Sequence, residues 1–103
     1  MAVNSELLGQ VRQQLNITWN DPDTDKRVNH IALSAQSAMA HQLGVKSDFD
    51  FSVPGIENTL VLAYCLYLWN NVEMGLFEEN YKPLILRARA IHEVEQAVED
   101  GEV

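Results

Sequence analysis

The chain has one cysteine, few basic residues and no long apolar run. Cys65 is the single cysteine, so an internal disulfide is excluded, and this low cysteine content fits a reducing compartment. The longest apolar run has ten residues, whereas a membrane-crossing helix needs about 20. Only 7 of the 103 residues are Lys or Arg, against 15 Asp or Glu, so the net charge is −8. A protein surface with an excess of negative charge repels nucleic-acid phosphates. No charged-then-apolar leader opens the sequence, so we expect no secretory signal.

Residue patterns typical of metal binding or catalysis are also missing. Residues 21–25 resemble the start of a calcium loop, but Lys26 stands where that loop needs a glycine. His30 and His41 are eleven residues apart, about 16 Å along a helix, which is too far to ligate one metal. No phosphate-binding glycine loop and no nucleophile–histidine–acid set is evident. We therefore expect no catalytic residue, no metal site and no cofactor.

The most informative feature present is the uncharged run LVLAYCLYLW at residues 60–69. Successive helical residues rotate by about 100°, so an apolar run of this length surrounds the helix axis. A helix that is apolar all round must be buried, and a chain of 103 residues can cover it only thinly. We therefore expect a central helix that neighbouring subunits help to cover, which favours a function in an assembly.

Capping residues and helical periodicity predict two helices in the first half of the chain. Asn4 or Ser5 suits the N-terminal cap of a first, short helix. Asp21 followed by Pro22 suits the start of a second helix, because proline loses no hydrogen bond in the first helical position. Gly44 would end the second helix as a left-handed residue.

The second half predicts two more helices and therefore an all-α, four-helix single domain over residues 1–103. A long irregular loop is expected at residues 45–55, between the second and third helices. The third helix is expected over residues 56–74 with Gly75 as its cap, and the fourth from near residue 80 with Pro83 in its first turn. A flexible acidic tail is expected at 96–103. The inward face of the fourth helix would carry Tyr81, Leu84, Ile85, Ala88, Ile91, Val94 and Val98.

The order of elements resembles that of a known family. LAYCLYLWNN at residues 62–71 is followed by FEENY at 77–81 and then by a helix at 84–89. The first half adds a short helix, the WND element at 19–21 and a helix rich in small residues. This order, over roughly residues 5–95, resembles the head–tail connector proteins of tailed bacteriophages, also called head-completion or adaptor proteins.

The resemblance implies a structural virion protein, not an enzyme. Such proteins form a homo-oligomeric ring of about a dozen copies. The ring sits beneath the portal protein in the neck between capsid and tail. It extends the DNA channel and receives a stopper or tail-completion protein. DNA passes through without specific binding, no membrane or cofactor is involved, and assembly takes place in the host cytoplasm.

Two sets of residues are candidates for contacts in such an assembly. Aromatic side chains dominate interface energetics, so the candidate subunit or portal interface comprises Trp19, Phe49, Phe51, Tyr67, Trp69, Phe77 and Tyr81. Within it, residues 48–51 would form a short strand or an extended arm, or else a loop folded over its own core. The candidate acidic lumen, for which a solvated tail is the alternative, comprises Glu93, Glu95, Glu99, Asp100 and Glu102.

Two functions from other classes also fit the sequence. An acidic DNA mimic would need carboxylates spread like phosphates, whereas residues 1–46 are neutral overall. A small helical regulatory dimer, similar to an antitoxin, would differ from a ring in mass. Light scattering therefore separates the dimer from a ring, and salt-sensitive competition with DNA for a basic partner would identify the mimic.

Overall fold

The structure is a computed structural model that describes residues 4–46 and 48–101, with side chains described up to residue 95. Its described part consists of four helices and no strand: α1 (Ser5–Gln14), α2 (Pro22–Leu43), α3 (Ile56–Trp69) and α4 (Met74–Gly101). The predicted all-α class is confirmed, and so is the loop between α2 and α3.

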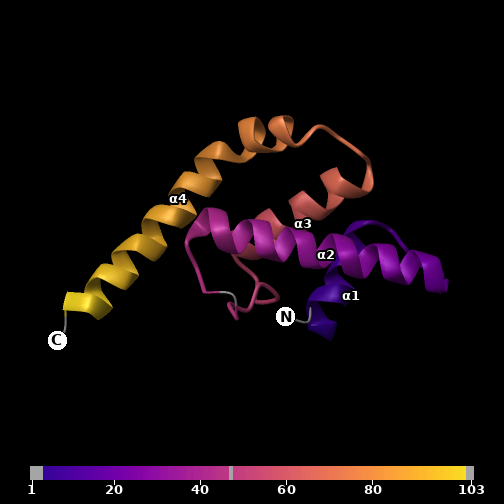
Figure 1. Ribbon diagram of the computed structural model, residues 1–103, viewed down its shortest axis with the longest axis horizontal. Helices are drawn as coiled ribbons and strands as arrows, with labels where there is room; N and C mark the ends of the chain where they lie inside the picture. The colour runs from indigo at the N-terminus through magenta and orange to yellow at the C-terminus, as the bar shows by residue number, and fades with distance from the viewer. Residues whose placement is uncertain (1–3, 47, 102–103) are drawn as a thin grey trace.

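Helices α2 and α3 form the centre of the fold. They pack against each other, and both pack against α1 and α4, whereas α1 and α4 do not touch within the described residues. Figure 1 shows α4 leading away from the other helices, so that the C-terminus and the start of α2 lie at opposite ends of the long axis. The molecule measures 50 × 28 × 19 Å. Its radius of gyration of 14.5 Å exceeds the roughly 13 Å of a compact chain of this length.

The predicted helix starts of the first half are confirmed. The Asn4 side chain accepts a hydrogen bond from the Leu7 N–H at 2.7 Å, at the start of α1. At the start of α2, the Asp21 side chain accepts from the Thr24 N–H at 3.2 Å, and Pro22 is the first helical residue. These bonds satisfy N–H groups that have no partner inside a helix.

Helices α1, α2 and α3 are each followed, within two residues, by a residue in the left-handed conformation. These residues are Asn16 (φ 58°), Gly44 (φ 71°) and Asn71 (φ 55°). The next residue in each case donates its N–H to a carbonyl five positions back, at 2.9–3.1 Å. The prediction of Gly44 is confirmed. The predicted end of α3 at Met74 is wrong: α3 ends at Trp69, because asparagine also tolerates the left-handed conformation that closes a helix.

The predicted start of α4 is wrong as well. The helix begins at Met74, so Gly75, the expected cap of the third helix, lies inside it, and Pro83 stands in its interior. Proline has no N–H to donate and crowds the preceding turn, which bends a helix. Figure 1 accordingly shows α4 changing direction in its first half. The backbone of residues 96–101 continues α4, where the sequence predicts a tail.

The apolar run of α3 is covered by its own protomer only in part. Four of its residues are buried: Leu60, Val61, Ala63 and Cys65. The others are half-buried: Leu62, Tyr64, Leu66, Tyr67, Leu68 and Trp69. Burial raises the pKa of the Cys65 thiol to about 12, so this cysteine is a core residue and not a reactive thiolate.

The loop between α2 and α3 folds back onto the core. Phe51 is only 1% exposed, and neighbouring polar groups tie the loop to two helices. The Asn58 amide of α3 donates to the Phe51 carbonyl at 2.7 Å, and the Gln10 amide of α1 donates to the Ser52 carbonyl at 2.8 Å. The predicted strand or extended arm is therefore wrong. Burying the apolar ring of Phe51 lowers the free energy of the folded state, so the loop packs against its own protomer.

Asp50 makes the stability of this loop dependent on pH. Its Oδ1 accepts from the Ser52 hydroxyl, the Ser52 N–H and the Asn4 amide. These bonds hold the pKa of Asp50 below its ordinary value of 3.8. A lowered folded-state pKa stabilises the fold above the unfolded-state pKa, and that contribution is lost as the pH falls through the folded-state pKa.

We therefore expect Asp50→Asn to destabilise the protein by a constant amount at neutral pH. The difference in unfolding free energy between the native protein and Asp50→Asn should shrink below about pH 4. Urea unfolding at several pH values measures this difference. A difference that stays constant down to pH 2.5 would contradict the assigned role of the Asp50 carboxylate.

Candidate interaction surface

Helix α4 carries apolar side chains on two opposite faces. Its inner face, which includes Phe77 and Ala88, is buried against the other helices. A second set, Pro83, Leu86, Ala90 and Val94, recurs every three or four residues on the opposite face, and all four are exposed. We call this set the outer stripe. Leu86 is 53% exposed and Val94 is 63% exposed. A helix with an uncovered apolar stripe is a candidate for contact with another protein.

Ile91 and Val94 were predicted to lie on the inner face of α4, and that prediction is wrong. Ile91 is 44% exposed, and Val94 belongs to the outer stripe. The reason is that α4 extends beyond the other helices at this point, as Figure 1 shows. The prediction for Val98 lies outside the described side chains.

The outer stripe is flanked by charges that are sorted by sign along the helix. Between Glu79 and Glu93, α4 carries Lys82, Arg87 and Arg89 and no acidic residue. From Glu93 to the C-terminus, the charges are all acidic. Arg89 Nε and a Glu93 carboxylate oxygen form an exposed ion pair at 3.3 Å, where the two charge blocks meet.

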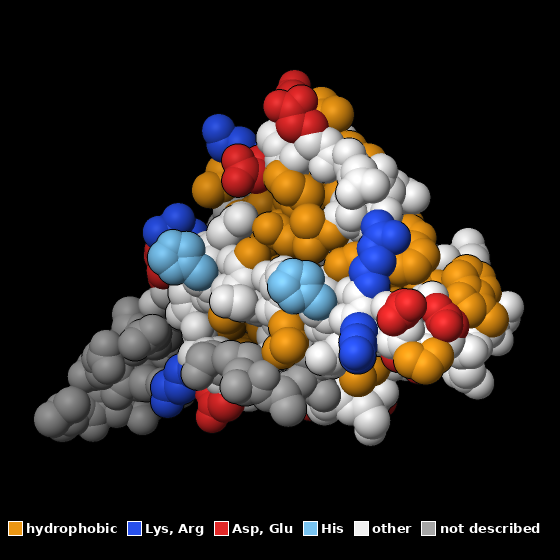
Figure 2. Space-filling view, turned by 45° about the vertical axis from the view of Figure 1, so that its right-hand side comes forward, with side chains coloured by type: hydrophobic (Ala, Val, Ile, Leu, Met, Phe, Trp, Pro, Cys, Tyr) orange, Lys and Arg blue, Asp and Glu red, His pale blue; other side chains and the backbone are white. Residues whose placement is uncertain are grey.

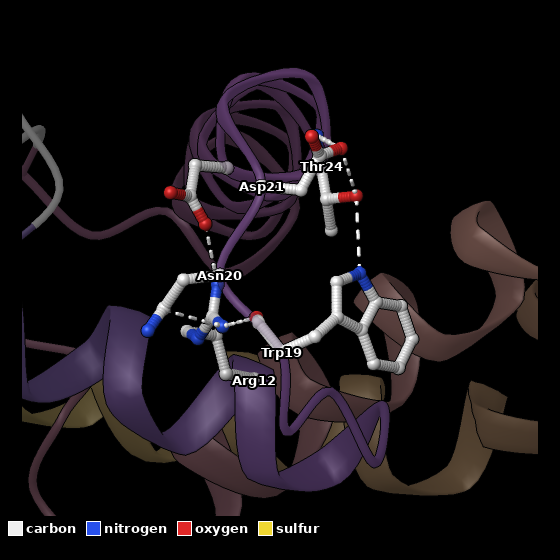
Figure 3. Close-up of polar contacts among 6 residues, drawn as sticks. Arg12, Trp19, Asn20, Asp21 and Thr24 are labelled. Carbon is white, nitrogen blue, oxygen red and sulfur yellow. Dashed lines mark hydrogen bonds and ion pairs between the residues drawn. The ribbon is translucent and has the colours of Figure 1, made fainter.

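The connection between α1 and α2 presents the second candidate surface, the side chain of Trp19. Its indole is 49% exposed, and the indole Nε1 donates to the Thr24 hydroxyl at 3.3 Å. That hydroxyl donates in turn to the Asp21 carboxylate at 3.0 Å. Figure 3 shows Trp19 and Thr24 joined on one side of the connection. The polar chain fixes the orientation of an exposed aromatic ring.

Arg12 of α1 braces the same connection from the other side. It forms an ion pair with Asp25 at 2.7 Å, and it donates to the Trp19 carbonyl and, at 3.4 Å, to the Asn20 side chain. Arg12 and Asn20 are visible together in Figure 3. Holding a side chain in one orientation before binding lowers the entropy lost in binding. Trp19 is therefore an exposed aromatic side chain on a connection that is held in place.

Figure 2 shows how side chains are distributed on the face that includes the start of α2. Apolar and acidic side chains stand next to each other at its right edge, at the end of the molecule where α2 begins. Trp19, Asp21 and Asp23, which stand just before or within the first turn of α2, are all exposed. Nearer the middle of the same view, apolar side chains lie in a hollow bordered by charged ones.

The other six aromatic candidates have partners inside the protomer. Phe77 is buried and lies against Tyr64, Tyr67 and Tyr81, with ring centroids 5.0–5.4 Å apart. Trp69 is half-buried beneath the guanidinium of Arg27, which is 4.4 Å from the ring centroid. These rings join α2, α3 and α4. In this conformation Phe77 cannot contact a partner protein, and the same holds for Phe51.

Phe49 is half-buried and belongs to a contact that the sequence analysis missed. Its ring meets Phe51 at 4.9 Å and the His92 imidazole of α4 at 5.4 Å, edge to face in both cases. His92 Nε2 lies 3.0 Å from a carboxylate oxygen of Glu57 at the start of α3. The residues are 35 positions apart, so no local spacing in the sequence points to this link.

The candidate acidic lumen residues are described only in part. Glu93 and Glu95 are exposed on α4, and Glu95 lies 3.6 Å from the His92 imidazole. Glu99 and Asp100 lie on the helical backbone, but their side chains are outside the described residues, and Glu102 is outside them altogether.

Two open grooves adjoin α4. One, of about 440 Å³, is lined by Gln42, Gly75, Glu78, Glu79, Lys82 and Ile85. The other, of about 280 Å³, is lined by Gly44, Val45, Lys46, Asp48, Phe49, His92 and Glu95. Among the described residues, no three His, Cys, Asp or Glu side chains are grouped to hold a metal ion.

None of the helices in the described part of the chain combines the length and the apolar character that crossing a membrane requires.

Comparisons with known proteins provide no match. No protein-family model matches the chain, and neither does any curated protein or solved structure.

Proposed function

We propose that this chain is a structural subunit of the neck of a tailed bacteriophage, a head–tail connector that forms a ring beneath the portal protein. The observation that carries the proposal is the exposed indole of Trp19, which a network of hydrogen bonds holds in place on the connection between α1 and α2. Tryptophan is enriched among residues that dominate the energy of protein interfaces.

The partial cover of α3 supports the same proposal. Its half-buried residues include Leu62 and Leu66, large apolar side chains that the three other helices leave in contact with solvent. A head-to-tail contact closes into a ring when its rotation permits, and a neighbouring subunit would complete the cover of α3. Trp19 is the anchor that this contact would use.

The acidic C-terminal part of α4 would then face the channel of the ring. Glu93 and Glu95 are exposed there, and the sequence continues with further carboxylates at 99, 100 and 102. Negative charge on a channel wall repels DNA phosphates, so DNA would pass without adhering.

Co-sedimentation with portal rings from the same phage genome tests the proposed function. Portal rings are needed in the test because a connector can stay dissociated until the portal templates its ring. We expect the chain to sediment with the portal in a fixed ratio and not with duplex DNA. A chain that ignores the portal but competes with DNA for a basic protein, with steep salt dependence, would be a DNA mimic.

A further inference from the structure

The outer stripe of α4 is arranged almost symmetrically about Ala90. Leu86 precedes Ala90 by four residues and Val94 follows it by four. The charges beside the stripe are opposite in sign on the two sides of Ala90, because Arg87 and Arg89 precede it and acidic residues follow it from Glu93 onward. A segment with apolar symmetry and charge antisymmetry is complementary to a copy of itself turned end to end.

We propose that the outer stripe binds the outer stripe of a second copy of this chain, with the two α4 helices antiparallel and a two-fold axis at Ala90. The inference does not depend on the proposed function. It concerns the free protein, and it assigns a partner to apolar side chains that nothing in the described protomer covers.

The apolar side chains fit this arrangement. An axis at Ala90 places Leu86 opposite Val94 of the partner subunit, and the reverse contact follows by symmetry. Ala90 itself has the smallest side chain of the stripe and lies at the crossing point, where a larger residue would hold the helices apart. The stripe spans residues 83–94, about 17 Å of helix, so the contact continues over about three turns.

The charges select the antiparallel orientation. Arg89 and Glu93 lie on the same flank of the stripe, where they form the ion pair at 3.3 Å. A two-fold axis at Ala90 brings this flank of both helices together, so that Arg89 approaches Glu93 of the partner subunit. The two exposed ion pairs then form one cluster, in which each Arg89 lies near Glu93 of its own chain and Glu93 of the partner subunit. Networks of ion pairs contribute more to binding than isolated surface pairs do. Parallel helices would instead place like charges side by side.

The contact is small and would be weak. A single helix face buries less than the roughly 1,200 Å² of a standard stable interface, so we expect a dissociation constant in the micromolar range or weaker. A two-fold contact closes at two copies. A single head-to-tail ring has no such axis between its subunits, so the pair would be a form that precedes a ring and opens before the ring closes.

Disulfide trapping of Ala90→Cys tests the two-fold axis. A residue on the axis faces itself, so Ala90→Cys should form a covalent dimer under mild oxidation at least ten times faster than the matched control Asn29→Cys. Asn29 is also exposed, on α2. The native Cys65 is buried and should not contribute. Leu86→Cys and Val94→Cys should crosslink to each other when mixed, and each only slowly to itself.

Charge reversal provides the second readout, by sedimentation equilibrium at protein concentrations up to about 1 mM. Arg89→Glu should abolish the dimer, and the swapped variant Arg89→Glu/Glu93→Arg should restore it. Three results would overturn the inference: a native chain that is monomeric at these concentrations, Ala90→Cys reacting no faster than its control, or Leu86→Cys trapping itself fastest, which indicates parallel helices. None of these results bears on binding to the portal, which the co-sedimentation experiment tests separately.

Discussion

Replacing Phe51 with alanine should destabilise the protein by about 3–5 kcal/mol, the range found when a fully buried phenylalanine is truncated. The ring is 1% exposed, and polar bonds from Asn58 and Gln10 hold the loop around it. For a chain whose total stability is expected to be about 5–15 kcal/mol, a loss of this size removes a large part of the stability of the folded state.

Phe49→Ala is the matched control for Phe51→Ala. Phe49 lies two residues away in the same loop but is only half-buried, so its truncation should cost about 1–2 kcal/mol. Urea unfolding followed by circular dichroism measures both variants. Equal, small losses for the two variants, together with lost binding to the portal, would show that the loop acts as an arm between subunits.

Trp19→Ala should have the opposite profile, with assembly lost and folding retained. Trp19 is 49% exposed, and its indole makes one hydrogen bond, to the Thr24 hydroxyl, so the free energy of unfolding should change by about 0.5 kcal/mol or less. A residue that anchors an interface contributes about 2 kcal/mol or more, which is roughly a 30-fold loss of affinity at each contact. A ring repeats the contact at every subunit, so the loss accumulates.

Two variants separate loss of the Trp19 ring from a general surface effect. Trp19→Phe keeps an aromatic ring and should retain part of the binding to the portal. Val53→Ala removes an equally exposed apolar side chain from a different part of the surface and should leave binding unchanged. If Trp19→Ala binds the portal as well as the native chain does, Trp19 is not the anchor.

Local signals in the sequence predicted the first half of the fold. Asn4, Asp21 and Gly44 cap helices through bonds to residues within five positions. Pro22 acts through its fixed φ angle, so the effect of all four residues can be inferred from spacing alone. In the second half, the end of α3 and the start of α4 have no such local signal. Asn71 ends α3 in a conformation that glycine usually supplies, and Pro83 is accepted inside α4 at the cost of a bend.

The candidate surface was predictable only where exposure follows from the local chain. Trp19 stands in a short connection between two polar residues, Thr18 and Asn20, and its ring is exposed in the structure. The residues next to Phe51 and Phe77 in the sequence do not show whether these rings are buried or exposed. Packing between helices buries both of them. The outer stripe was missed because Val94 was assigned to the inward face and the other three residues of the stripe to no face, and only the path of α4 past the other helices shows that a second apolar face is uncovered.

Electron microscopy of portal rings from the same phage genome, imaged with and without this chain, tests whether the chain forms a connector ring. We expect an added ring of density on the axis of the portal, continuing its channel, which Trp19→Ala removes. Portal rings that look the same with and without a saturating amount of the folded chain would contradict it.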